Sequence, residues 1–272
     1  MPPIDLLLTA ELLALGCATG FLAGLLGIGG GMLMVPFITA ILSYRGVAPA
    51  LAVKMAIATS MATIVFTSLS SVRAHHRRGA VRWDLVATLA PGIVVMSLLT
   101  GAFIFPLVRG VALALLFAVF VGYSATQMLI DRKPAPSRQL PGPAGRLAAG
   151  GAIGLMSGLV GAGGGFISVP FMTWCNVRIH NAIATSAALG FPIALASTAG
   201  NLIGGRSLPP ALPGAFGYLY LPALAVISVA SVLLAPVGAR AAHALDVRQL
   251  KRVFALLLYV LASYMLWKGL TG

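Results

Sequence analysis

Charged residues are scarce in this chain, and acidic residues are the scarcest of all. Only 8% of the 272 residues are charged, and Asp and Glu together number five, whereas a soluble domain has roughly 25% charged residues. Cysteine is also rare. Cys17 and Cys175 lie in apolar segments without the spacing of metal ligands, so we expect them to serve packing. These scarcities exclude an ordinary soluble domain and argue against a cysteine-based metal centre.

Apolar and basic residues make up the balance. Hydrophobic residues account for 59% of the chain, and apolar runs of about 20 residues recur along nearly all of it, as membrane-spanning helices require. The net charge of +13 could suggest nucleic acid, but there is no soluble domain to bind it. The first residues, MPPIDLLL, place no basic region before the apolar run, so no cleaved signal peptide is expected. The basic residues instead gather in loops, as in the cytoplasmic loops of membrane proteins: Arg73, Arg77, Arg78 and Arg82; Arg132, Lys133, Arg138 and Arg146; Arg240, Arg248, Lys251 and Arg252.

Two stretches of the chain repeat. Residues 20–38 read GFLAGLLGIGGGMLMVPFI, and residues 154–172 read GLMSGLVGAGGGFISVPFM, with ten identical positions. The pentapeptide AIATS at 56–60 recurs letter for letter at 182–186. Two matches in the same order indicate a duplicated unit.

The repeat divides the chain into two halves of five apolar elements each. Residues 1–130 form the first transmembrane repeat and 147–272 the second. The polar, basic and Pro-rich stretch 131–146 forms a cytoplasmic linker between them. In each half a glycine cluster separates the first apolar element from a second, shorter one. Pro36 and Pro170 fit best in a first helical turn, so each short helix should start within a few residues before them.

Five elements is an odd number, so the halves should lie in opposite orientations. We expect an all-α integral membrane protein with two inverted-topology repeats, whose Gly-broken helix pairs meet near the midplane of the bilayer. Placing 73–82, 131–146 and 239–252 in the cytoplasm satisfies every strong basic cluster, and both termini then lie outside. The alternative, in which each broken pair is one long crossing, would put 239–252 outside and is rejected.

The glycine clusters indicate a binding site. Non-helical backbone cannot face lipid, because its N–H and C=O groups would be unsatisfied. Glycine lets a ligand or another backbone come close, and the helix that follows presents free N–H groups and a positive dipole end. Paired interrupted helices at corresponding positions indicate a transporter's substrate site, here one for an anion. The predicted site glycines are Gly29, Gly30, Gly31, Gly163, Gly164 and Gly165.

Other candidates have structural alternatives. Gly20, Gly24, Gly154 and Gly158 suit close helix packing better than binding. Thr59, Ser60, Thr185 and Ser186 are ligand candidates, although such hydroxyls commonly bond their own helix. Lys54 and His180 occupy equivalent positions, either as loop charges or as cations that attract the anion. Asn201 is a further candidate, as an intramembrane polar group.

The pattern GxxxGxxGxGGGxxxxP, followed in each half by AIATS, resembles the sulfite exporter TauE/SafE family of membrane transporters, and HHRRGAVRW fits that family's first half. The resemblance covers nearly the whole chain. It implies a secondary transporter, most simply an exporter, of small sulfur-containing anions such as sulfite or sulfonates, in a bacterial-type plasma (inner) membrane. It carries over to Gly29–Gly31, Gly163–Gly165, Thr59–Ser60 and Thr185–Ser186.

The mode of coupling and two other functions stay open at this stage. Of the acidic residues only Glu11 could lie within a span, which gives little support to a carboxylate proton relay. Passive movement driven by the membrane potential would need no proton site. An anion channel, or a carrier of non-sulfur anions such as carboxylates, could use the same glycine loops. A membrane enzyme is not expected, because no catalytic or metal motif is present. We expect a small anion and the lipid bilayer as partners, with a coupling proton or ion possible, and no cofactor or metal.

Overall fold

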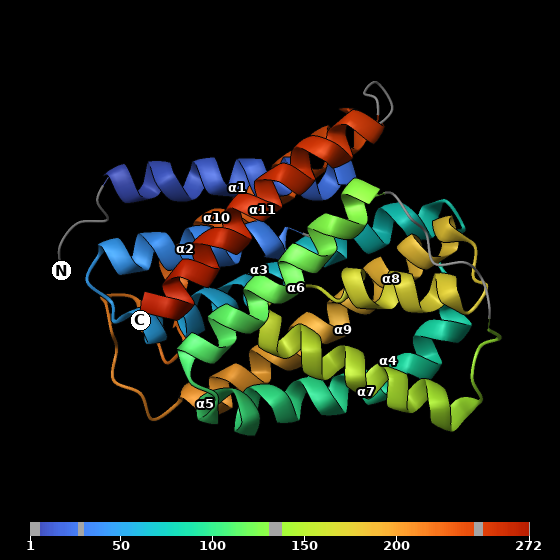
Figure 1. Cartoon of the computed structure of the whole chain (residues 1–272), viewed down its shortest axis with the longest axis horizontal. Helices are drawn as coiled ribbons and strands as arrows, with labels where there is room; N and C mark the ends of the chain where they lie inside the picture. The colour runs from blue at the N-terminus through green and yellow to red at the C-terminus, as the bar shows by residue number, and fades with distance from the viewer. Residues whose placement is uncertain (1–5, 27–29, 131–137, 242–246, 272) are drawn as a thin grey trace.

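The computed structural model describes residues 6–26, 30–130, 138–241 and 247–271 of the chain (Figure 1). The first half contains α1 (Leu6–Leu26), α2 (Gly31–Tyr44), α3 (Pro49–Arg77), α4 (Trp83–Leu99), a π-helical segment η1 (Thr100–Ile104), α5 (Phe105–Leu107) and α6 (Gly110–Ile130). The second half contains α7 (Pro143–Val160), α8 (Gly165–Trp174), α9 (Ile179–Gly205), α10 (Leu221–Ala241) and α11 (Val247–Thr271). Two short strands, β1 (Ala215–Phe216) and β2 (Leu219–Tyr220), pair antiparallel before α10.

The expected all-α membrane architecture is confirmed. Seven helices in the described part of the chain are long and apolar enough to cross a membrane. The short helices α2 and α8 start at Gly31 and Gly165, each five residues before its proline. Sequence patterns did not anticipate the π-helical segment after α4 or the β1–β2 hairpin. The helix α7 begins at Pro143, inside the stretch expected as linker, because Pro at the first helical position is already set for a helix.

The most extensive helix packing joins the two halves, while the short helices α2 and α8 pack on α3 and α9 of their own half. The first helix of each half packs along the fourth helix of the other, α1 on α10 and α7 on α4, while α3 packs along α9 and α6 along α11. Gly20 permits the first contact, since a Cβ there would lie 2.4 Å from the Cα of Ser231. Gly154, its repeat counterpart, does the same against Ile93, where a Cβ would lie 2.6 Å from the carbonyl oxygen. The packing role expected for these glycines matches this geometry.

The short helices of both halves end in the same way. Gly46 and Asn176 adopt the left-handed conformation, with φ of 85° and 65°. The next N–H, that of Val47 or Val177, bonds a carbonyl five residues earlier, at Leu42 or Met172. This is the Schellman arrangement, for which Gly and then Asn are the favoured residues. The helix α2 has 14 residues and α8 has 10, so α2 is about one turn longer than α8.

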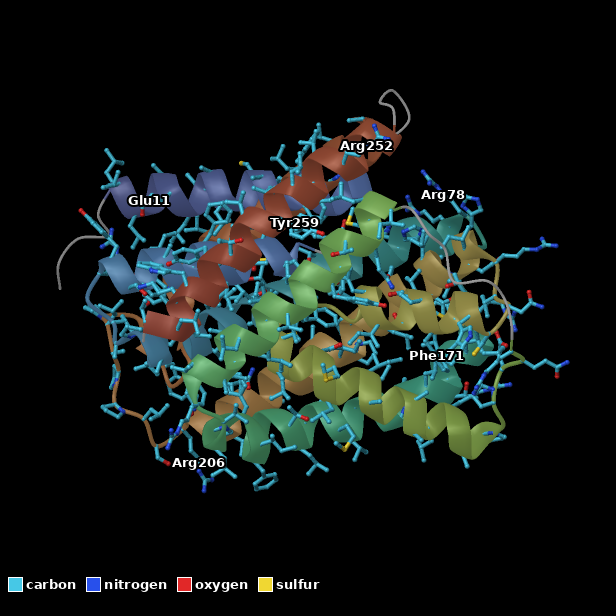
Figure 2. All side chains as sticks on the ribbon, in the orientation of Figure 1. Glu11, Arg78, Phe171, Arg206, Arg252 and Tyr259 are labelled. Atoms are coloured by element: carbon cyan, nitrogen blue, oxygen red, sulfur yellow. The ribbon has the colours of Figure 1, made fainter. Side chains whose placement is uncertain are left out.

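The two ends of the helix bundle differ in character. In Figure 1, α1 runs from left to right and α7 from right to left, and α1 begins at the same end at which α11 finishes. Figure 2 places Arg78 and Arg252 toward the right and Glu11 and Arg206 toward the left. The turn that follows α3 and the described end of the linker before α7 both lie at the right-hand end (Figure 1). The predicted basic loops 73–82 and 131–146 are therefore at one end, as far as the structure describes them.

Candidate functional site

The two glycine segments, far apart in sequence, contact each other at the start of α2. A Cβ on Gly31 would lie 2.6 Å from the carbonyl oxygen of Gly161 and 3.4 Å from the Cα of Ala162, so no larger residue fits here without movement. The buried Ser60 hydroxyl lies 3.5 Å from the Gly31 carbonyl oxygen and 3.3 Å from that of Gly161. One serine of α3 therefore joins the backbones of both segments. Gly29 lies outside the described residues.

The second glycine segment turns sharply between two helices. Gly161 closes α7 in the left-handed conformation with φ of 76°, and Gly164 precedes α8 with φ of 77°. Between them, the Gly164 N–H donates to the Ala162 carbonyl at 2.7 Å. Glycine is favoured at both positions because a side chain disfavours positive φ. The chain can thus end one helix and begin another within four residues.

Ser186, the repeat counterpart of Ser60, also contacts its glycine segment, through an intermediary. The Ser168 hydroxyl on α8 lies 2.7 Å from the Ser186 oxygen and 2.9 Å from the Gly164 carbonyl oxygen. The carbonyl oxygen of Gly163 lies against Gly190 of α9. Both repeated serines therefore lie beside non-helical backbone in the interior of the protein. Ser168 was missed by sequence reasoning because its repeat counterpart is Met34.

The hydroxyls of the repeated threonines form hydrogen bonds away from the glycine segments. Thr59 accepts the backbone N–H of Tyr220 at 3.0 Å, and Thr185 accepts that of Arg82, also at 3.0 Å. Tyr220 directly precedes α10 and Arg82 directly precedes α4, so each threonine holds the start of a helix in the other half. This geometry favours a structural role for Thr59 and Thr185 over ligand binding.

Lys54, His180 and Asn201 lie apart from the contact between the glycine segments. The Lys54 ammonium donates to the Pro106 carbonyl at 2.9 Å and faces the rings of Phe105 and Tyr218, 5.9 and 5.6 Å from their centroids. Lys54 and His180 each precede the repeated serine by six residues, about 9 Å along a helix. His180 is exposed near the start of α9. Asn201 is 1% exposed, and neither its amide nitrogen nor its oxygen has a hydrogen-bond partner.

Comparisons with known proteins identify the family of this chain. The family model described as sulfite exporter TauE/SafE matches residues 12–265. The chain belongs to the TauE/SafE family. It is 37% identical over 257 residues to a probable membrane transporter protein of Haemophilus influenzae, which covers 94% of this chain and 97% of the relative. It is 25% identical over 265 residues to a probable membrane transporter protein of Methanocaldococcus jannaschii, with 96% of each chain covered.

A third relative, from Bacillus subtilis, matches over a shorter stretch of the chain. A probable membrane transporter protein of that organism is 38% identical over 80 residues, 29% of this chain and 27% of the relative. No solved structure matches. The resemblance inferred from the doubled glycine motif is thereby confirmed, and the TauE/SafE chain is a multi-pass membrane protein.

Histidine, cysteine and carboxylate side chains do not gather in the described part of this TauE/SafE chain. No group of three or more His, Cys, Asp or Glu residues there could hold a metal ion. Cys175 is buried and Cys17 partly buried, and both are free thiols. The glycine contact itself is built from backbone groups and the Ser60 hydroxyl, which suit hydrogen bonding.

Proposed function

We propose that this protein is a secondary transporter, acting as an exporter, of small sulfur-containing anions such as sulfite or sulfonates. Transport would proceed by alternating access around the paired glycine segments. The observation that carries the proposal is the contact between the segments, where Gly31 lies against Gly161 and Ser60 lies beside the carbonyls of both. Membership of the TauE/SafE family and the transporter names of the relatives support it.

The geometry supports an anion for a simple electrostatic reason. The helices α2 and α8 start at Gly31 and Gly165, beside this contact. The first-turn N–H groups of a helix have no partners within it, and the helix dipole adds a positive end. The Ser60 hydroxyl lies beside the Gly31 and Gly161 carbonyls. The Ser186 hydroxyl contacts Ser168, which bonds the Gly164 carbonyl. Oxyanions accept several hydrogen bonds at once, so they suit such a concentration of donors.

The proposed orientation follows from the basic end of the bundle. We place Arg78 and Arg252 in the cytoplasm and Arg206 outside, in a bacterial-type plasma membrane. The opposed directions of α1 and α7 support an inverted repeat (Figure 1). In this orientation the membrane potential drives an anion outward by about 2.3 kcal/mol per charge per 100 mV. Export then needs no carboxylate relay within the membrane.

Counterflow in proteoliposomes tests the function. Vesicles preloaded with unlabelled sulfite or sulfoacetate should accumulate the labelled anion transiently, because a carrier exchanges substrate across the membrane. An anion channel would give no transient accumulation. Accumulation with preloaded carboxylates only would keep the carrier and remove the sulfur assignment. Unlabelled sulfate, phosphate and acetate provide the specificity panel.

Two variants test the site within that assay. Ser60→Ala removes the hydroxyl shared by the two segments and should slow counterflow roughly five- to tenfold, the worth of about one hydrogen bond. Gly122→Ala is the matched control, because a Cβ there meets nothing within 4 Å, and it should leave counterflow unchanged. Normal transport by folded Ser60→Ala protein would contradict the assignment of the glycine contact as the site.

A further inference from the structure

A group of buried polar side chains without partners lies beside the second glycine segment. Five of the buried polar side-chain atoms that lack a hydrogen bond in the described chain belong to Thr100, Ser157, Ser197 and Asn201. Each of these four residues is at most 1% exposed. Other hydroxyls of this protein follow the usual pattern and bond a carbonyl of their own helix, as Thr39 and Thr63 do. A buried polar group with no partner is costly, so a concentration of them suggests a missing ligand.

These side chains come from three elements that meet at Gly158. A Cβ on Gly158 would lie 3.1 Å from Thr100 Cγ2 and 3.6 Å from Ser197 Oγ, so α7, η1 and α9 converge there. Asn201 follows Ser197 by one helical turn and therefore lies on the same face of α9. Gly101 of η1 packs against the backbone of Gly200 and Asn201, which keeps this contact between η1 and α9 close.

The group adjoins the proposed anion site through Ser157. A Cβ on Gly164 would lie 3.4 Å from Ser157 Oγ. Ser157 is in the last turn of α7, where the helix dipole is negative and carbonyls lack partners within the helix. The start of α8, with its positive dipole end, lies a few residues further on. The broken pair α7–α8 therefore offers a negative end and a positive end side by side.

From this arrangement we infer that Thr100, Ser157, Ser197 and Asn201 hold a monovalent alkali cation, Na⁺ or K⁺, which binds together with the transported anion. The ligands are three hydroxyl oxygens and one carboxamide oxygen, the neutral oxygen type that binds hard cations. Unwound backbone and the C-terminal ends of half-helices coordinate coupling ions in other transporters. No acidic residue occurs in α7, η1 or α9, so the cation's charge would be balanced by the bound anion.

This inference rests on the proposed function and gives it a coupling ion. A cation near the α7 terminus and an anion at the α8 terminus attract each other, so each should raise the affinity for the other by the same factor. The pair carries no net charge for a monovalent anion. The membrane potential would then drive only anions of higher charge, and for a monovalent anion the outward gradient of K⁺, not the inward gradient of Na⁺, would support the export proposed above.

Binding to the purified full-length protein tests the inference. Apparent Tm is measured in sodium chloride, potassium chloride and choline chloride at equal ionic strength, with and without sulfite. We expect Na⁺ or K⁺ to raise Tm relative to choline, and to lower the apparent Kd for sulfite at least fivefold. Thr100→Val and Ser197→Ala should lose both effects. They remove a hydroxyl that has no protein partner, so their stability in choline chloride should be unchanged or higher.

Ser228→Ala is the matched control, since Ser228 is also a buried serine without a partner but lies on α10, and it should keep the full cation effect. Equal Tm values in all three salts would overturn the inference, and water would then be the partner of the four side chains. A cation effect that persists in Thr100→Val and Ser197→Ala would overturn it as well. A Tm that rises with Na⁺ or K⁺ but not with sulfite would instead count against the proposed substrate. The failure of the cation inference and the failure of the proposed function are therefore distinguishable.

Discussion

Gly163 and Gly164 are neighbours in the second glycine segment, yet they differ in what they tolerate. Gly164 has φ of 77°, and a Cβ there would lie 2.3 Å from Ile193 Cδ1. A Cβ on Gly163 would meet only Ile64, at 3.4 Å or more, which is ordinary contact. The two neighbouring glycines therefore meet different structural requirements. Gly164 is required by backbone conformation and space, while Gly163 leaves room for a side chain.

Substituting alanine for Gly163 and for Gly164 in separate variants should reveal this difference as a difference in stability. Gly164→Ala should destabilise the protein by about 1–2 kcal/mol, since alanine is strained at positive φ and the end of the Ile193 side chain must also shift. Gly163→Ala should leave stability nearly unchanged. Apparent Tm of the two purified variants, measured in the same detergent, checks the difference. Equal Tm values for the two variants would contradict the left-handed turn at Gly164.

At the scale of elements, Thr59 and Thr185 connect the two halves of the chain. Each is a residue of a central helix, α3 or α9, and each accepts an N–H from the residue that precedes a helix of the other half. The sequence showed that AIATS is repeated but gave no sign of its partners. The partners, Tyr220 and Arg82, are different residue types, and each contributes only its backbone N–H. Every residue except proline has that group. Side-chain patterns therefore could not reveal this pairing.

Removing either acceptor should loosen the corresponding helix start. Thr59→Val leaves the buried Tyr220 N–H without a partner and should cost about 1–3 kcal/mol, and Thr185→Val should cost a similar or smaller amount at the less buried Arg82. Thr63→Val is the control, because Thr63 bonds only the carbonyl of Thr59 in its own helix. Thermal unfolding of the three variants provides the comparison. A Thr59→Val protein as stable as the control would remove the proposed anchor.

At the scale of the whole molecule, the charge distribution predicts the orientation in the membrane. Arg78 and Arg206 lie toward opposite ends of the bundle (Figure 2). In a background with Cys17 and Cys175 replaced by Ser, Arg206→Cys should react with an impermeant maleimide from outside the cell. Arg78→Cys should react only in inverted membrane vesicles. Labelling of both positions from the same side would contradict the odd number of crossings in each half.

Much of this architecture follows from sequence because the bilayer restricts the choices. Apolar length fixes the spanning helices, and a triplet of glycines weakens a helix by roughly 3 kcal/mol, so breaks near Gly31 and Gly165 were predictable. The order of the repeated stretches in the sequence predicted which helix of the first half corresponds to which helix of the second. The π-helical segment η1 escaped prediction, because Thr100–Ile104 continues the apolar run of α4 without any residue that marks the change in hydrogen bonding.

The sequence by itself therefore determined the membrane class, the duplication and the positions of the broken helices, since these depend on local hydrophobicity and on backbone preferences along the chain. Only the tertiary structure decided that Gly31 meets Gly161, that Ser60 lies between their carbonyls, and that Thr100 and Ser197 meet at Gly158. These contacts join segments that are far apart in sequence, more than a hundred residues in the case of Ser60 and Gly161. They depend on which helix faces pack together, and hydropathy alone does not distinguish one apolar face from another.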